Sequence, residues 1–112
     1  MSLVAPAAAG MGLSAATMEQ ICATLARFPQ VEKGVVYGSR AKGNFKPGSD
    51  IDLTLRGEGL TLSLLGDIDM ALDDLLLPYE IDLSAYDQIR HAELVAHIDR
   101  VGRVGRVIYQ RL

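Results

Sequence analysis

The most informative stretch of the sequence is GSRAKGNFKPGSDIDL, residues 38–53. It follows residues 35–37 (VVY), whose β-branched and aromatic side chains predict a short strand. The glycines and the proline within residues 40–49 indicate a helical turn followed by a loop. Residues 50–55 then alternate polar with apolar side chains, which is typical of a half-buried strand. The stretch therefore predicts two strands that are joined by a helical turn and a loop.

Helices and a further strand are predicted on both sides of this stretch. Apolar residues at helical spacing predict three helices, and a second alternating run predicts another strand. The first helix starts near Ser14 or Thr17 and ends at Pro29. The second covers about 62–76 and the third about 89–110, and the strand covers 79–84. Thr61 supplies the side-chain oxygen that caps the second helix. The mixture of helices and strands indicates a fold of the α/β (α+β) class.

Length and charge limit the possible classes of protein. The chain has 112 residues and a mass of 12.1 kDa, which fits one domain. Residues 1–13 are uncharged and rich in small residues, so we expect a flexible N-terminal tail before a domain over 14–112. The net charge of −3 and the pI of about 5.2 argue against nucleic acid as a direct ligand.

Cysteine content and hydropathy exclude further classes. A single cysteine, Cys22, rules out an intrachain disulfide framework and a cysteine-rich zinc site. Cys22 lies on the apolar stripe of the first helix, so we expect a buried side chain rather than a nucleophile. No apolar run reaches the roughly 18 residues of a membrane span, and the N-terminus lacks the basic segment of a secretory signal. We therefore expect a cytoplasmic domain that works with a partner.

Three aspartates on the two alternating strands form a candidate metal site. Asp50 and Asp52 are two residues apart and point the same way, and Asp82 has apolar neighbours on the later strand. If these strands are adjacent, the three carboxylates converge on one patch of the sheet. Carboxylate oxygens suit Mg²⁺, and two such ions clamp the attacking and leaving oxygens of a nucleotidyl transfer. The alternative is a solvated sheet face with three surface acids.

A candidate phosphate site lies immediately before these strands. Gly38 ends the first strand, where the absence of a side chain lets a phosphate approach the backbone. Ser39 adds a hydroxyl at the start of the helical turn, whose free N–H groups bind anions. Arg40, Lys42 and Lys46 supply positive charge within a few residues. The sequence therefore predicts a phosphate cradle that a short loop links to a metal-binding strand.

These motifs together resemble the signature of the DNA polymerase β-like nucleotidyltransferase superfamily. The signature is Gly-Ser, ten residues, then Asp-x-Asp, which Gly38-Ser39 and Asp50-Ile51-Asp52 match without a departure in spacing. Asp82 matches the third carboxylate of the family. Because the chain is so short, it is similar to the minimal nucleotidyltransferase (MNT) group. The resemblance implies a small mixed β-sheet flanked by helices.

The resemblance also implies a reaction and a partner. MNT proteins pair with small helical HEPN proteins, the MNT protein acting as antitoxin to a HEPN toxin RNase. The implied activity is transfer of AMP from ATP, with two Mg²⁺ ions, to a tyrosine of the HEPN partner. The implied roles are phosphate binding by Gly38 and Ser39, metal binding by Asp50, Asp52 and Asp82, proton removal by Asp82, pyrophosphate neutralisation by Arg40 and Lys42, and nucleotide binding by Ser49.

Two other functions remain open from the sequence. The chain can be a non-catalytic, nucleotide-binding antitoxin that neutralises its partner by contact, although contact alone does not need three carboxylates. It can also modify a small molecule such as an antibiotic, although it lacks room for an acceptor-binding domain. The sequence leaves the acceptor, the base preference and the oligomeric state open.

Overall fold

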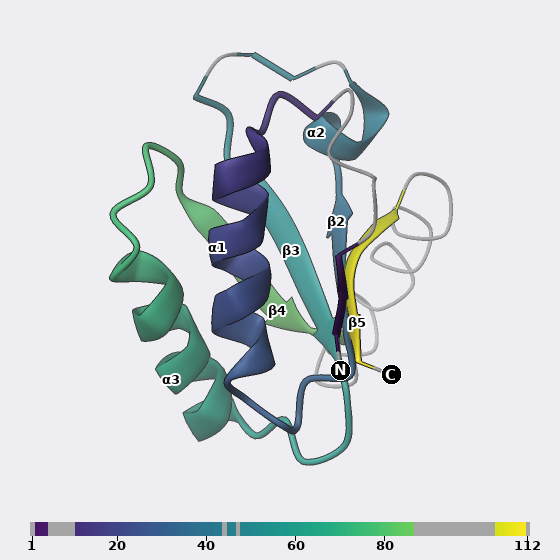
Figure 1. Ribbon diagram of the computed structural model, residues 1–112, viewed down its shortest axis with the longest axis vertical. Coiled ribbons are helices and arrows are strands. Elements are labelled where there is room, and N and C mark those ends of the chain that lie inside the picture. The colour runs from purple at the N-terminus through teal and green to yellow at the C-terminus, as the bar shows by residue number, and fades with distance from the viewer. Residues whose placement is uncertain (1, 5–10, 44, 47, 87–104, 112) are drawn as a thin grey trace.

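The computed structural model describes residues 2–4, 11–43, 45–46, 48–86 and 105–111. Strands and helices alternate along the chain from β1 to β4, as Figure 1 shows. The elements are β1 (Ser2–Val4), α1 (Ala15–Ala26), β2 (Lys33–Tyr37), α2 (Ser39–Lys42), β3 (Ile51–Arg56), α3 (Leu62–Asp73), β4 (Ile81–Ala85) and β5 (Arg106–Arg111).

The strands form one mixed sheet of 5 strands in the order β1-β5-β2-β3-β4. β3 and β4 run parallel, and the other neighbouring strands pair antiparallel. Helices α1 and α3 lie together over one face of this sheet, and α2 lies at one end of it (Figure 1). A parallel pair needs a crossover connection, and α3 provides it between β3 and β4. The predicted mixed sheet with flanking helices is therefore confirmed.

The hydrophobic core lies between the sheet and the two long helices. In β3, Ile51, Leu53 and Leu55 alternate with polar residues and are fully buried. They pack in one cluster with the apolar side chains of α1 and α3, which include Ile21 and Ile68. The strict alternation of β3 therefore places its apolar residues in the core and Asp52 on the opposite face of the strand.

The two long helices α1 and α3 begin directly after Ser14 and Thr61, where the sequence predicted that helices start. The side-chain oxygen of Ser14 accepts a hydrogen bond from the backbone N–H of Thr17 at 3.1 Å, so Ser14 caps α1. Thr61 caps α3 in the same way, by accepting from the N–H of Leu64 at 3.1 Å. Within the described part of the chain, no helix has both the length and the apolar character to cross a membrane.

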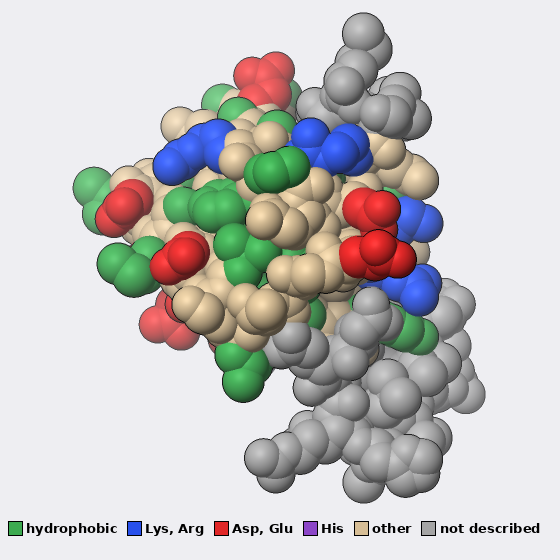
Figure 2. Space-filling view, turned by 90° about the horizontal axis from the view of Figure 1, so that it is seen from below, with side chains coloured by type: hydrophobic (Ala, Val, Ile, Leu, Met, Phe, Trp, Pro, Cys, Tyr) green, Lys and Arg blue, Asp and Glu red, His purple; other side chains and the backbone are tan. Residues whose placement is uncertain are grey.

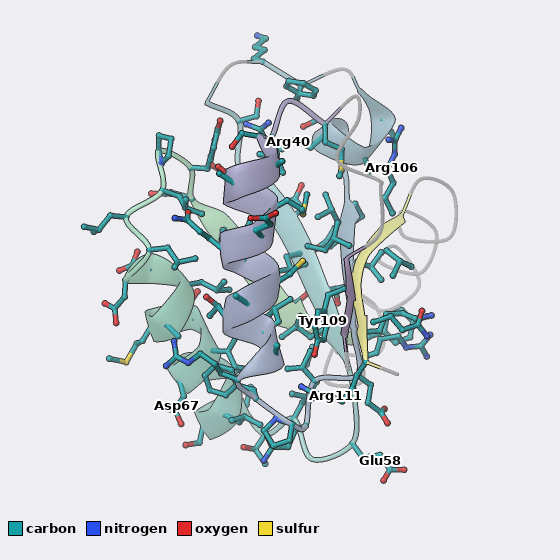
Figure 3. All side chains as sticks on the ribbon, in the orientation of Figure 1. Arg40, Glu58, Asp67, Arg106, Tyr109 and Arg111 are labelled. Atoms are coloured by element: carbon teal, nitrogen blue, oxygen red, sulfur yellow. The ribbon has the colours of Figure 1, made fainter. Side chains whose placement is uncertain are left out.

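The predicted helix over about 89–110 is wrong at its C-terminal end. Residues 106–111 form β5, which pairs with β1 and β2, and residues 87–104 lie outside the described residues. The run Val107-Ile108-Tyr109 explains the strand, because β-branched and aromatic side chains favour a pleated surface. Arg111 ends β5 at the opposite end of the molecule from Arg40 of α2 (Figure 3).

The predicted flexible tail over 1–13 also differs from the structure. Residues 2–4 form β1, which pairs antiparallel with β5. Met11 and Leu13 are buried in the core, with 0% and 7% of their surface exposed. An uncharged segment with apolar residues can therefore gain order from burial even when it has no periodic pattern of its own.

The end of the molecule away from α2 carries charges of both signs. In Figure 2, which views this end, acidic and basic side chains are interspersed rather than gathered by sign. A cavity of about 630 Å³ lies here and is lined by Glu32, Lys33, Arg56, Gly57, Glu58, Gln110 and Arg111. The predicted phosphate and metal residues lie at the other end of β2 and β3.

Candidate active site

The turn after β2 touches the strand that carries the predicted metal ligands. Gly38 has φ 76° and ψ −152°, a backbone conformation that is essentially restricted to glycine. A Cβ atom at Gly38 would collide with Oδ2 of Asp52. Tyr37, which precedes the glycine, is the register partner of Asp52 in the β2–β3 ladder. The predicted cradle and the predicted metal strand are therefore in direct contact.

Two of the three predicted carboxylates are neighbours across the parallel ladder. Asp52 of β3 and Asp82 of β4 are register partners, so their side chains leave the same face of adjacent strands. Asp82 is exposed, and Asp50 is exposed directly before β3. Among the residues that the structure describes, no group of three or more acidic, histidine or cysteine side chains forms a ready cation cage.

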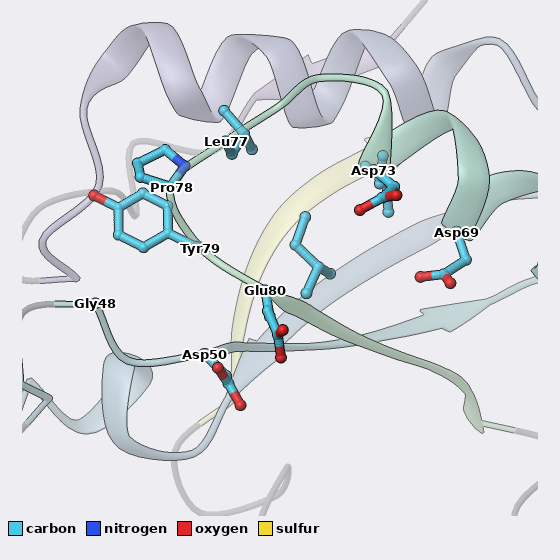
Figure 4. Close-up of a pocket in the computed structure, with 10 residues that line it drawn as sticks. Gly48, Asp50, Asp69, Asp73, Leu77, Pro78, Tyr79 and Glu80 are labelled. Atoms are coloured by element: carbon cyan, nitrogen blue, oxygen red, sulfur yellow. The ribbon is translucent and has the colours of Figure 1, made fainter.

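A cavity of about 550 Å³ opens beside Asp50. Its walls come from the loop before β3, from α3 and from the segment that leads into β4 (Figure 4). Asp50 and Glu80 lie side by side with their carboxylates pointing the same way, while Asp69 and Asp73 line the α3 side (Figure 4). The other lining residues are Gly48, Leu72, Leu77, Pro78, Tyr79 and Ile81. The cavity therefore combines an apolar wall with carboxylates.

Glu80 is a site residue that the sequence reasoning missed. It precedes β4, and its backbone carbonyl accepts a hydrogen bond from the N–H of Ile51 at 2.8 Å, which brings it level with Asp50. The available signal was the alternation of residues 79–84, because Glu80 and Asp82 fall on the same face of that run.

The polar residues of α2 and of the loop that follows it divide into an accessible set and a buried one. Ser39, half-buried, begins α2 directly after Gly38, and Lys42 and Lys46 are exposed. Arg40 is buried, and its guanidinium donates to the carbonyls of Ser49 and Met11. Lys42 and Lys46 are therefore the accessible cations near the cradle, whereas the side chain of Arg40 points into the protein.

Ser49 closes the loop that leads into β3. Its hydroxyl oxygen accepts a hydrogen bond from the backbone N–H of Lys46 at 2.9 Å, and its own N–H donates to the carbonyl of Lys46 at 3.0 Å. These two bonds fix the turn immediately before Asp50. The structure thus gives Ser49 a part in the shape of the loop, and nucleotide binding by its side chain stays a prediction.

The donor set fits Mg²⁺ and a nucleoside triphosphate. Asp50, Asp52 and Asp82 offer the hard oxygen ligands that Mg²⁺ binds together with substrate phosphates. The missing Cβ of Gly38 lets the carboxylate of Asp52 lie directly against the turn that begins α2. These residues could hold a metal-bound triphosphate between α2 and β3.

Cys22 lies in the core, as predicted. Its thiol donates to the carbonyl of Ile108 at 3.1 Å, and 3% of the residue's surface is exposed. Burial raises the pKa of the thiol from 9.0 to about 11. Cys22 therefore stays protonated near neutral pH and does not act as a nucleophile.

Several solved structures with a similar fold are toxin–antitoxin complexes. One is a toxin–antitoxin with AMP-PNP, 18% identical, with a TM-score of 0.68, covering 84% of this chain and 73% of that chain. A second is the toxin–antitoxin MntA-HepT, 15% identical, with a TM-score of 0.65 and coverages of 88% and 74%. A third is a tri-AMPylated Shewanella oneidensis HEPN toxin in complex with MNT antitoxin, 15% identical, with a TM-score of 0.64 and coverages of 86% and 71%.

The family follows from the sequence itself. No curated protein matches this chain significantly, and the solved structures at these identities show the fold alone. The sequence profile described as "Polymerase beta, Nucleotidyltransferase" matches residues 19–111, which include the cradle, all three predicted carboxylates and β5. The chain therefore belongs to the polymerase beta nucleotidyltransferase family.

Proposed function

We propose that this chain transfers AMP from ATP to a hydroxyl group of a partner protein, a tyrosine of a HEPN-type toxin, and so acts as its antitoxin. The observation that carries the proposal is the contact between the Gly38 turn and Asp52, with Asp82 beside it across the ladder. Family membership supports a nucleotidyl transfer. The fold shared with an AMPylated HEPN toxin–antitoxin complex supports the partner.

Each part of the site has a separate task in this reaction. The backbone after Gly38 and the hydroxyl of Ser39 bind the β- and γ-phosphates. Asp50, Asp52 and Asp82 hold Mg²⁺, two ions in this proposal, which when bound stabilise the charge that develops on the phosphate oxygens. Lys42, which is exposed beside the cradle, attracts the leaving pyrophosphate.

The transfer forms one bond to the α-phosphorus, breaks another and moves one proton. The acceptor oxygen forms a bond to the α-phosphorus of ATP while the bond from that phosphorus to the bridging oxygen of pyrophosphate breaks. Asp82, exposed on β4, accepts the proton of the acceptor hydroxyl. Pyrophosphate leaves toward Ser39 and Lys42. The use of ATP as donor fits a reaction in the cytoplasm.

The acceptor needs positioning that this small domain supplies only in part. The cavity beside Asp50 is open to the surface and has an apolar wall that includes Leu77 and Tyr79. A protein acceptor brings its own surface and so holds its hydroxyl in line with the α-phosphorus, which lowers the entropic cost of the reaction. This favours a protein over a free small molecule.

The direct test is the mass of the partner. We expect the neighbouring gene to encode a HEPN-type protein, and incubation of that protein with Mg²⁺, ATP and this chain to raise its mass by one or more AMP units and to lower its RNase activity. Asp52→Asn should abolish the mass gain while the protein stays folded, because the metal loses a ligand at the reacting phosphate. Asp67→Asn is the matched control, since Asp67 is exposed on α3 away from the cavity (Figure 3).

The same experiment separates the alternatives. A partner whose mass is unchanged but whose RNase activity is lost identifies a non-catalytic antitoxin that acts by contact. AMP transfer to a hydroxylated small molecule in the absence of any partner identifies an antibiotic-type enzyme. Equal transfer by wild type and Asp52→Asn shows that Asp52 is part of a solvated sheet face.

A further inference from the structure

Arg40 is a fully buried cation next to the candidate active site. Only 1% of its surface is exposed, and it is among the largest fully buried side chains of the described residues. Burying a charge is costly unless hydrogen bonds compensate for the lost water. Here Nε and Nη2 donate to the carbonyl of Ser49 at 3.0 and 2.8 Å, and Nη1 donates to the carbonyl of Met11 at 2.8 Å. The buried guanidinium is therefore satisfied by backbone groups.

Two aromatic rings complete the surroundings of this guanidinium. Its central carbon lies 4.9 Å from the ring centre of Phe45 and 4.6 Å from that of Tyr79. Both distances fall within the range of a cation–π interaction, which strengthens when the cation is removed from water. Phe45 belongs to the loop before β3 and Tyr79 to the segment before β4. Arg40 thus connects two segments that are far apart in the sequence.

Two of the partners of Arg40 directly precede carboxylates that line the cavity. Ser49 comes immediately before Asp50, and Tyr79 comes immediately before Glu80. Arg40 itself lies two residues after Gly38. One side chain therefore connects the phosphate turn to the entry of β3 and to the entry of β4, in addition to the ladder bonds that join β2, β3 and β4.

We propose that Arg40 is a positioning residue, which holds Asp50 and Glu80 in place relative to the Gly38-Ser39 turn. The planar guanidinium presents donors in a fixed fork and also stacks on rings, whereas a lysine ammonium does neither. Lysine at this position keeps the charge but loses the paired bonds to Ser49. The part of this inference that concerns catalysis depends on the nucleotidyl transfer proposed above.

Arg111 provides a matched control at the opposite end of the sheet (Figure 3). Its guanidinium also binds backbone carbonyls, those of Val31 at 3.1 Å, Ala26 at 3.2 Å and Phe28 at 3.1 Å. Arg111→Lys therefore removes a comparable set of bonds without touching the loops that carry the carboxylates. Any effect that comes only from a weaker fold should appear in both variants.

The test compares Arg40→Lys with Arg111→Lys by two measurements. The first is AMP transfer, with kcat and the KM for ATP determined separately for each protein. The second is amide hydrogen exchange of residues 48–51 and 79–81 without nucleotide. For Arg40→Lys we expect kcat to fall about 10- to 100-fold, the range for displaced catalytic groups, with a smaller change in KM. We also expect faster exchange in both segments, whereas Arg111→Lys leaves these values near those of wild type.

A milder variant guards against a failure of Arg40→Lys to fold. Phe45→Leu removes one ring but leaves every hydrogen bond of Arg40 in place. We expect it to lower kcat in the same direction but by less than Arg40→Lys, because one of the two ring contacts is lost while the hydrogen bonds remain. An unchanged kcat in Phe45→Leu, with faster exchange confined to its own loop, counts against the inference.

The results separate this inference from the proposed function. If Arg40→Lys and Arg111→Lys change kcat and exchange to the same extent, Arg40 contributes only to stability and the inference is overturned. If wild type transfers no AMP at all, the proposed function fails, and hydrogen exchange alone then decides the role of Arg40. Faster exchange of both segments in Arg40→Lys only still supports positioning, and equal exchange refutes it.

Discussion

Replacing Gly38 by alanine probes the contact on which the proposed site depends. The backbone at Gly38, with φ 76° and ψ −152°, lies in a region that only glycine adopts easily, and each such strained residue costs about 1–3 kcal/mol. The new Cβ would also collide with Oδ2 of Asp52. Moving a side chain off its preferred rotamer costs about 0.5–1.5 kcal/mol. We therefore expect Gly38→Ala to lower the free energy of unfolding by about 2–4 kcal/mol.

Gly59→Ala is the control for the backbone part of this effect. Gly59 also has a positive φ, 78°, but the nearest atom to an added Cβ is Cγ of Gln30 at 3.7 Å, an ordinary contact. It lies in the loop between β3 and α3, away from the cradle. Only the conformational cost applies there, so we expect a loss of about 1–2 kcal/mol in the free energy of unfolding.

Urea denaturation measures the loss of stability in each variant, and a nucleotide-binding assay measures the loss of the phosphate site. Urea unfolding of the two variants gives the difference in stability, with unchanged m-values as the sign of an unchanged unfolding reaction. Thermal shift with Mg²⁺ and ATP then reports binding. Gly38→Ala should lose the shift because the displaced Asp52 carboxylate and the added methyl group both occupy the cradle, and Gly59→Ala should keep it. Equal stabilities and equal thermal shifts in the two variants would refute the argument.

Three further predictions address the metal, the buried thiol and a helix. ATP with Mg²⁺ at 100-fold over Kd should stabilise the fold by about 2–3 kcal/mol, and an equal shift in EDTA would rule out metal bridging. The folded protein keeps the Cys22 proton to a higher pH than the unfolded chain, so this contribution to stability is present below pH 9.0 and is lost as pH rises toward about 11. Urea midpoints across this range should fall less in Cys22→Ala than in wild type. Gly66→Ala, at an exposed position of α3 where an added Cβ meets no atom within 4 Å, should raise stability by about 0.5–1 kcal/mol, measured by urea denaturation; a loss of stability would contradict the open space seen there.

The sequence predicted the strands that carry Asp52 and Asp82 well because their local pattern and their burial agree. Residues 50–55 and 79–84 alternate, and each strand has a buried face and a polar face in the fold. The Gly38 turn was also predictable, since a glycine between a strand and a helical turn commonly marks a backbone conformation that larger residues avoid. In the two strands, the alternation of apolar and polar residues is enough to predict which side chains face the core.

The errors concern features that depend on distant partners. β1 has three residues and exists through its pairing with β5, so it has no periodic signal to read. β5 was assigned to a helix because Ile108 continues a helical spacing of apolar residues from the segment before it. The helical spacing was given more weight than the β propensity of the segment, although Val107 and Tyr109 on either side of Ile108 favour a strand.

The burial of Arg40 is a feature that the sequence alone does not reveal, and its role toward the phosphates stays a prediction. A basic residue beside a phosphate turn is expected to face the phosphate. Its burial depends on Phe45, on Tyr79 and on the carbonyl of Met11, which come from three separate segments of the chain. Lys42, two residues later, has the same charge and is exposed. The choice between the two is made by tertiary packing.

The order of the strands has a consequence for the synthesis of this protein. β5, the last of the described strands along the chain, lies inside the sheet between β1 and β2. As the chain leaves the ribosome, β2, β3 and β4 can pair first, and the edge of β2 stays without its partner until residues 106–111 emerge. An open strand edge invites pairing with other chains during that interval. We therefore expect the open edge of β2 to make the nascent chain prone to aggregation in the interval before β5 is made, when the strands that bear Asp52 and Asp82 have already paired.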